Sequence, residues 1–198
     1  MNASNIVERV KKLLLTPSEE WKVIKGESHT VAGLFTNYVM ILAAIPAVAW
    51  FIGFSIVGYS GMGPTTRVPI GAGLANLVLS YILGLGSVYV IALVIDAFAP
   101  KFGGEQDFTQ ALKVAAFFPT SYWVGGLFYM LPTLSILAIL GALYSLWLLW
   151  TGLALLMGVE DHRAAPYTVI VMLVAVVLMI VAAIVTGLAI PSNSRGFL

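Results

Sequence analysis

The chain has 198 residues, of which 60% are apolar and only 10% are charged. This composition is typical of a polytopic membrane protein and excludes an ordinary soluble globular domain. The net charge of +1 gives no reason to expect nucleic-acid binding, and a chain without cysteine forms neither disulfides nor thiolate metal sites.

Residues 1–32 are predicted to form an amphipathic cytoplasmic tail of two short helices. In the first helix, Val10, Leu13 and other apolar residues recur at helical spacing, while charged residues occupy much of the opposite face. The second helix is predicted to start at Pro17, because proline suits a first helical position. A basic segment beside a membrane span serves either as an anchor among lipid headgroups or as a docking site for a protein. The residues expected at this lipid or partner interface are Lys11, Lys12, Trp21 and Lys22.

Residues 33–190 are predicted to form an all-α membrane domain of five transmembrane helices. A helix needs about 20 predominantly apolar residues to cross a hydrocarbon core of roughly 30 Å. Five apolar blocks reach or nearly reach that length, and the third is the least regular because it contains Pro119. Their expected bounds are residues 33–58, 70–98, 110–131, 133–158 and 166–190. Residues 191–198 then form an external C-terminal tail.

The distribution of charge predicts the orientation in the membrane. All nine acidic residues lie in the tail or near the gaps that follow the second and fourth spans. Of the ten Lys and Arg residues, only Arg67 and Arg195 lie on the opposite side. Basic residues in short loops resist translocation, so we expect a cytoplasmic N-terminus and an external C-terminus.

Polar side chains are sparse within the predicted spans. Asn37 and Asn76 are the only amides in the interior of these spans, and Asp96 lies near the cytoplasmic end of the second span. We expect no charged side chain at mid-membrane depth, which disfavours a charge-coupled pump. An amide such as that of Asn76 is more often a hydrogen bond between helices than a ligand of a substrate.

The cytoplasmic loops contain the candidate ligands for a metal ion. Carboxylates that converge at one mouth of a helix bundle suit a divalent cation. The competing interpretation is that these are solvated loop charges, and that Asp107 caps the start of the third span. The candidate metal ligands are Asp96, Glu105, Asp107, Glu160 and Asp161.

Motifs of known enzyme classes are not found in the sequence. It contains no GxSxG, no P-loop and no HExxH motif. We therefore expect a protein that is not an enzyme and that uses no cofactor.

A series of landmarks resembles a known membrane-protein family. In chain order they are Pro17-Ser-Glu-Glu-Trp21, Phe102-Gly-Gly104, Phe108-xx-Ala111-Leu112-Lys113, Pro132, Leu146-Trp147 and Gly152-Leu153. Together they resemble the compact, prokaryotic-type branch of the Yip-one domain family (Ypt/Rab-interacting proteins). The resemblance implies five spans with a cytoplasmic N-terminus. It also implies kinship with eukaryotic members that reside in Golgi and endoplasmic-reticulum membranes and bind Rab GTPases and one another.

Two departures limit what the resemblance implies. Eukaryotic members have a DLYGP-type and a YGYSL-type motif, where this chain has Asp96-Ala-Phe-Ala-Pro100 and Phe117-Phe-Pro-Thr-Ser121. Their long cytosolic tails are also absent. These departures disfavour Rab binding and favour a bacterial inner-membrane protein over a Golgi or endoplasmic-reticulum protein.

Three functions are compatible with these observations. The first is a membrane organiser that self-associates and recruits an unknown membrane or cytoplasmic protein through its cytoplasmic face. The second is a small transporter or channel, with a divalent cation held by the five carboxylates. The third is lipid handling, which the amphipathic tail and the proline-containing spans suggest. All three place the protein in contact with the lipid bilayer and none involves nucleic acid.

Overall fold

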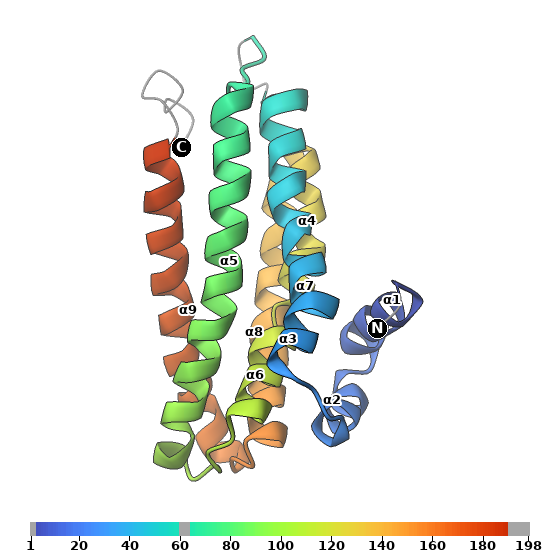
Figure 1. The fold of residues 1–198 in the computed structure, drawn as a ribbon, viewed down its shortest axis with the longest axis vertical. Coiled ribbons are helices and arrows are strands. Elements are labelled where there is room, and N and C mark those ends of the chain that lie inside the picture. The colour runs from blue at the N-terminus through green and yellow to red at the C-terminus, as the bar shows by residue number, and fades with distance from the viewer. Residues whose placement is uncertain (1–2, 60–63, 190–198) are drawn as a thin grey trace.

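The computed structural model describes residues 3–59 and 64–189, and its regular elements are all helical (Figure 1). The expected all-α fold is therefore confirmed. The N-terminal part comprises α1 (Ala3–Leu15), α2 (Pro17–Gly26), α3 (Val31–Leu34), the π-helix η1 (Phe35–Val39), α4 (Met40–Phe51) and the π-helix η2 (Ile52–Val57). The remainder comprises α5 (Ile70–Phe98), η3 (Ala99–Phe102), α6 (Phe108–Phe117), α7 (Thr120–Gly125), η4 (Gly126–Met130), η5 (Pro132–Leu137), α8 (Ala138–Leu156) and α9 (Asp161–Ala189). The predicted tail 191–198 lies outside the described residues.

Four helical segments are long and apolar enough to cross a membrane. They are Val31–Val57, Ile70–Phe102, Pro132–Leu156 and His162–Leu188. The first continues through Pro46 with π-helical stretches on both sides, and the last continues through Pro166. These four segments correspond to the first, second, fourth and fifth of the predicted spans.

The third predicted span, residues 110–131, is not one continuous helix. It is divided into α6, α7 and η4, and the break falls at Phe118 and Pro119. Proline lacks the N–H group that would continue the helical hydrogen bonds, which accounts for the break. The segment nevertheless runs along the bundle, because α6 contacts α3 and η1 while η4 contacts α4 and η2.

The two ends of the bundle are formed by different elements. We call the end with α1, α2 and the start of α6 the tail end, and the end where η2, α5 and η4–η5 meet the distal end (Figure 1). All seven residues from Ala111 to Phe117 of α6 are buried. By contrast, only 6% of the apolar stretch of α9 is buried, so this helix presents most of its surface to lipid.

Close approach of α7 and α8 forms the middle of the bundle. The Ser121 hydroxyl donates a 2.5 Å hydrogen bond to the Gly141 carbonyl and lies 2.9 Å from the Ser145 hydroxyl. A Cβ atom at Gly141 would lie 2.4 Å from the Ser121 carbonyl oxygen, so only glycine fits there. Small residues at Gly141 and Ser145 therefore let these two helices approach closely, as is common in membrane bundles.

Candidate functional site

The tail is docked onto the bundle rather than extended away from it. Trp21 of α2 is fully buried against α8, and its indole N–H donates a 3.1 Å hydrogen bond to the Thr151 hydroxyl. Gly152 leaves room for the ring, because a Cβ atom there would lie 2.9 Å from Cζ2 of Trp21. Trp21 was predicted to lie at a lipid or partner interface, and in this structure its hydrophobic ring is covered by α8.

Polar contacts fix the C-terminal end of α2 to α6 and α8. The Lys25 carbonyl accepts hydrogen bonds from Lys113 Nζ (3.1 Å) and from Gln110 Nε2 (3.3 Å), both on α6. The Lys25 ammonium in turn donates a 2.7 Å hydrogen bond to the Leu155 carbonyl near the end of α8. The Lys113 side chain, only 2% exposed, therefore places its positive charge at a helix C-terminus, where the helix dipole stabilises it.

The first helix of the tail lies along the flank of the bundle. Its residue Leu13 is fully buried, and the Leu14 carbonyl accepts a 2.8 Å hydrogen bond from the Tyr144 hydroxyl of α8. Tyr144 precedes Leu156, the last residue of α8, by 12 positions, which corresponds to about 18 Å along the helix. The end of α1 therefore lies beside the bundle, next to the middle of the segment Pro132–Leu156.

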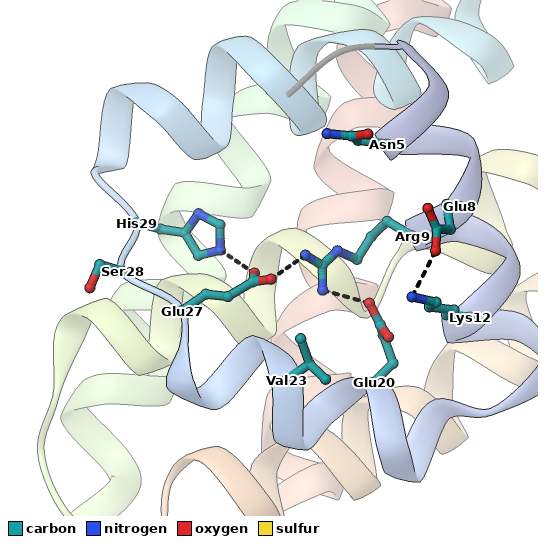
Figure 2. A pocket seen from close by; sticks show the side chains of 9 residues that line it. All are labelled: Asn5, Glu8, Arg9, Lys12, Glu20, Val23, Glu27, Ser28 and His29. Atoms are coloured by element: carbon teal, nitrogen blue, oxygen red, sulfur yellow. Dashed lines mark hydrogen bonds and ion pairs between the residues drawn. The ribbon is translucent and has the colours of Figure 1, made fainter.

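An ion network joins α1, α2 and the segment that leads into α3 (Figure 2). Arg9 donates 2.5 Å hydrogen bonds to both Glu20 and Glu27, and His29 lies 2.8 Å from the second oxygen of Glu27. The Arg9 guanidinium also lies 5.7 Å from the centre of the Phe117 ring on α6. Arg9 lies on α1 and contacts Glu20 of α2, Glu27 just after α2 and Phe117 of α6. It therefore holds three parts of the chain together.

The network carries a net negative charge when His29 is neutral, because it contains one guanidinium and two carboxylates. Burial raises the pKa of Glu27, but hydrogen bonds from Arg9 and His29 outweigh that effect, so its pKa lies below the ordinary value of 4.5. Glu20 is only 5% exposed at its side chain, so its ion pair with Arg9 is shielded from solvent.

A pocket of about 520 Å³ opens beside this network. Figure 2 shows the network side chains together with Asn5, Val23 and Ser28 around it, and Lys12 paired with Glu8 at 2.8 Å on its rim. The hydrogen bond from Lys12 lowers the pKa of the exposed Glu8 carboxyl. The pocket contains groups of both signs that already pair with one another, so it is a mixed-charge surface.

Three of the predicted interface residues are exposed, in contrast to Trp21. Lys11 and Lys12 lie on α1 and Lys22 lies on α2. Apolar side chains are exposed on the same two helices, most of all Leu15, at 78%. The docked tail therefore presents lysines beside apolar side chains.

The predicted metal ligands lie in separate places. Asp107 caps α6 by accepting hydrogen bonds from the backbone N–H groups of Thr109 and Gln110, as the competing interpretation expected. Asp96 accepts a 3.4 Å hydrogen bond from Gln106, and its other oxygen is buried without a hydrogen-bond partner in the described residues.

The remaining candidates lie in the two loops. Glu105 is exposed, and Glu160 pairs with His162 and Arg163 at 3.6 and 3.9 Å. The backbone of Asp161 starts α9, but its side chain lies outside the described part of the structure. Among the side chains that are described, no three or more His, Asp or Glu residues are placed to hold a metal ion. Cation binding therefore stays a prediction.

Reasoning from the sequence did not find the ion pairs and polar partners that hold the tail. Arg9 and Glu20 are 11 positions apart, so their pairing depends on the turn between two helices and not on a spacing within one. Lys113 gave the clearest signal, because a lysine near the start of an apolar span needs a polar partner. That partner, the Lys25 carbonyl, is 88 positions away.

Comparisons with known proteins support the same interpretation of the chain. Residues 11–184 match the family model of the Yip1 domain. The chain is similar to an inner membrane protein of Escherichia coli strain K12 named YohC, with 26% identity over 156 residues that cover 77% of this chain and 80% of that protein. The YohC protein of the Escherichia coli O6:H1 strain CFT073 matches with the same figures. No solved structure matches the chain.

Proposed function

Since the chain belongs to the Yip1 domain family, we propose that it is a non-enzymatic protein of the cell inner membrane that recruits a protein partner to its tail face. We define the tail face as the exposed side of α1 and α2, with Lys11, Lys12, Lys22 and Leu15. The similarity to a bacterial protein named as an inner membrane protein supports the location. The charge distribution supports a cytoplasmic position for this face.

The single observation that carries the proposal is the fixed docking of the tail. A free anchor would need only a hydrophobic side, whereas this tail is bound by the Trp21–Thr151, Lys25–Leu155 and Lys113–Lys25 hydrogen bonds. A surface held in one shape loses less conformational entropy when it binds a partner, and this favours specific recognition.

The chemistry of the tail face favours a partner with an acidic rim and an apolar centre. The apolar Leu15 lies one helical turn from Lys11, and both are exposed. Interfaces commonly combine an apolar centre with charged groups around it, and the charges guide association. The partner can be a soluble protein or a second membrane protein, including another copy of this chain.

The test is photo-cross-linking in native membranes from a photoreactive residue at position 18, on the exposed side of α2. We expect one defined heterologous or homologous adduct, reduced at least fivefold by Lys22→Glu. The matched control is Lys101→Glu, because Lys101 is an exposed lysine at the same end of the bundle but on η3. Recovery of uncross-linked monomer alone, or an equal effect of both substitutions, would contradict the proposal.

The two other functions have less support. The described carboxylates do not form a cation site, so no specific observation favours a divalent-cation transporter. Lipid handling as an activity would require a path that crosses the bundle from end to end, and no such path is described. A separate cavity is relevant to lipid binding.

A further inference from the structure

A second cavity, of about 530 Å³, lies in the distal half of the bundle. We call it the distal cavity; residues of α4, η2, α5, α7, η4, η5, α8 and α9 line it. All of these elements belong to segments that cross or run along the membrane. None of the described residues that line it is charged. A site of this kind favours an uncharged ligand, because an unpaired ion at this depth is costly.

Two stripes of side chains line the distal cavity. On α5 the stripe is Asn76, Ser80 and Gly84, and each residue is one helical turn from the next. On α4 and the following η2 the wall is formed by Pro46, Trp50 and Phe54, and the rings of Trp50 and Phe54 stack at 5.0 Å. The stripe from Asn76 to Gly84 is about 12 Å long, so the cavity is a groove parallel to the helices.

Polarity falls along the α5 stripe from the distal end inward. Asn76 is six positions from the start of α5, which places it roughly 9 Å from the distal end of that helix. Its amide makes no hydrogen bond to any described residue, so the expected link between helices is not formed. The Ser80 hydroxyl donates to the Leu77 carbonyl at 3.2 Å, and Gly84 adds no side chain. The groove therefore offers a free amide near the membrane surface and an apolar wall deeper down.

The groove is accessible from the side that faces lipid. Ile136 and Ile139 line it and are also 65% and 50% exposed on the outer surface of the bundle. Thr186 of α9 forms part of another wall, and α9 is the least buried of the four long spans. In a bilayer this surface is in contact with acyl chains, so a ligand enters from the hydrocarbon region and not from water.

We infer that the distal cavity binds one acyl chain of a phospholipid from the leaflet at the distal end, with the ester carbonyl at Asn76 and the chain running past Ser80 toward Gly84. A phospholipid has its polar ester near the surface and its chain toward the bilayer centre, which is the order of polarity along the stripe. This inference does not depend on the tail face or on a protein partner.

A helix from a second copy of the chain is a poorer occupant. A helix with its side chains is about 10–12 Å across, so a piece as long as the stripe would occupy roughly 900–1,400 Å³. The distal cavity has about 530 Å³. A single acyl chain is much thinner than a helix and is already present at high concentration around the protein.

Glycines on α5 provide a matched pair of variants for the test. A Cβ atom at Gly84 meets no atom within 4 Å, so Gly84→Leu would fill the groove without striking the backbone. Gly86 is equally open and is exposed, but it does not line the distal cavity. Gly86→Leu therefore adds the same side chain to the same helix outside the groove.

The experiment uses the full chain in vesicles of phosphatidylethanolamine and phosphatidylglycerol that contain a phosphatidylcholine with a photoactivatable diazirine in one acyl chain. After illumination, mass spectrometry of peptides maps the label. We expect label on the Trp50–Phe54 and Asn76–Gly84 peptides, reduced at least fivefold in Gly84→Leu and unchanged in Gly86→Leu. If Gly84→Leu is not monodisperse, Ser80→Leu replaces it, because Ser80 lines the same wall.

Three outcomes would overturn the inference. The first is equal labelling of the groove peptides in Gly84→Leu and Gly86→Leu. The second is labelling only at outward residues such as Leu74 and Val78, which are exposed on α5. The third is a cross-link between two copies from a photoreactive residue at position 50, since this would make a second chain the occupant.

Discussion

In the tail half of the bundle, long polar side chains cross between segments that are far apart in the sequence, whereas the distal half has a groove and a helix that faces mainly lipid. Every ion pair in the described residues lies at the tail end, between residues 8 and 29 or between 160 and 163. The distal half contains the 530 Å³ cavity and the poorly buried α9. The difference indicates that specific polar contacts hold the tail half, while the distal half leaves space for the acyl chain proposed above.

The largest effect that would test this contrast is expected for Trp21→Ala. Removing a fully buried tryptophan and its hydrogen bond to Thr151 should destabilise tail docking by about 4 kcal/mol. The weaker docking should appear as faster hydrogen exchange of the backbone amides of α1 and α2. Trp150→Ala is the control, because this tryptophan on α8 is 41% exposed and its loss should leave the tail protected. Equal effects of the two substitutions would remove the distinction between a docked and a lipid-facing tryptophan.

The next largest effect is expected for Arg9→Met. This change keeps much of the side-chain volume but leaves the buried Glu20 without its cation, which should cost about 3 kcal/mol of docking free energy. Limited proteolysis in detergent should then cut the tail near residue 27 much faster than in the wild type. Lys11→Met, on the exposed side of the same helix, should leave the cleavage rate unchanged. Slow cleavage of both variants would show that the ion network does not hold the tail.

A pair of glycine substitutions compares the two halves directly. Gly152→Ala should destabilise the protein by about 1–2 kcal/mol, because the new methyl group meets the Trp21 ring at 2.9 Å. Gly84→Ala should be neutral or stabilising by up to about 1 kcal/mol, since its Cβ meets nothing within 4 Å and alanine favours a helix. Thermal unfolding of each variant measures the difference. Destabilisation by Gly84→Ala would mean that the distal half is as tightly packed as the tail half.

The smallest effect is a dependence of tail docking on acidity. Because the pKa of Glu27 in the docked tail lies below its ordinary value of 4.5, docking is favoured while this carboxyl is ionised. The contribution is therefore complete above the pKa of the undocked state and is lost as the pH falls through the lower docked value. Glu27→Gln should remove this part of the dependence of docking on pH. The difference between the variant and the wild type then measures the contribution of Glu27 alone, without that of the neighbouring Arg9, Glu20 and His29. Identical profiles of hydrogen exchange against pH in both proteins would contradict the expectation.

A structural feature was predictable from the sequence when the residues that form it lie close together along the chain. Four spans and the two tail helices were predictable, because hydropathy and helical spacing are properties of contiguous residues. Asp107 was predictable as a cap for the same reason. The burial of Trp21 was not, since Thr151 and Gly152 form its site 130 positions later in the chain.

The broken third span shows a different limit. Its apolar composition predicted a span, and Pro119 indicated an irregularity, but the division into α6, α7 and η4 depends on what surrounds it. Lipid cannot satisfy the backbone groups freed at such a break, whereas neighbouring helices can. The break is therefore tolerated in the segment that other elements cover on most sides. The distal cavity was not predictable either, because its two stripes lie on different helices.

The contact between Trp21 and Thr151 also determines when the protein can complete its fold during synthesis. The tail leaves the ribosome first, but the hydroxyl that receives its indole N–H is made 130 residues later. At about 5–20 residues per second, translation of that interval takes roughly 7–26 s. During this time the Trp21 ring lacks the site on α8 that buries it in the complete structure. Docking of the tail can therefore be completed only after Thr151 of α8 has been synthesised.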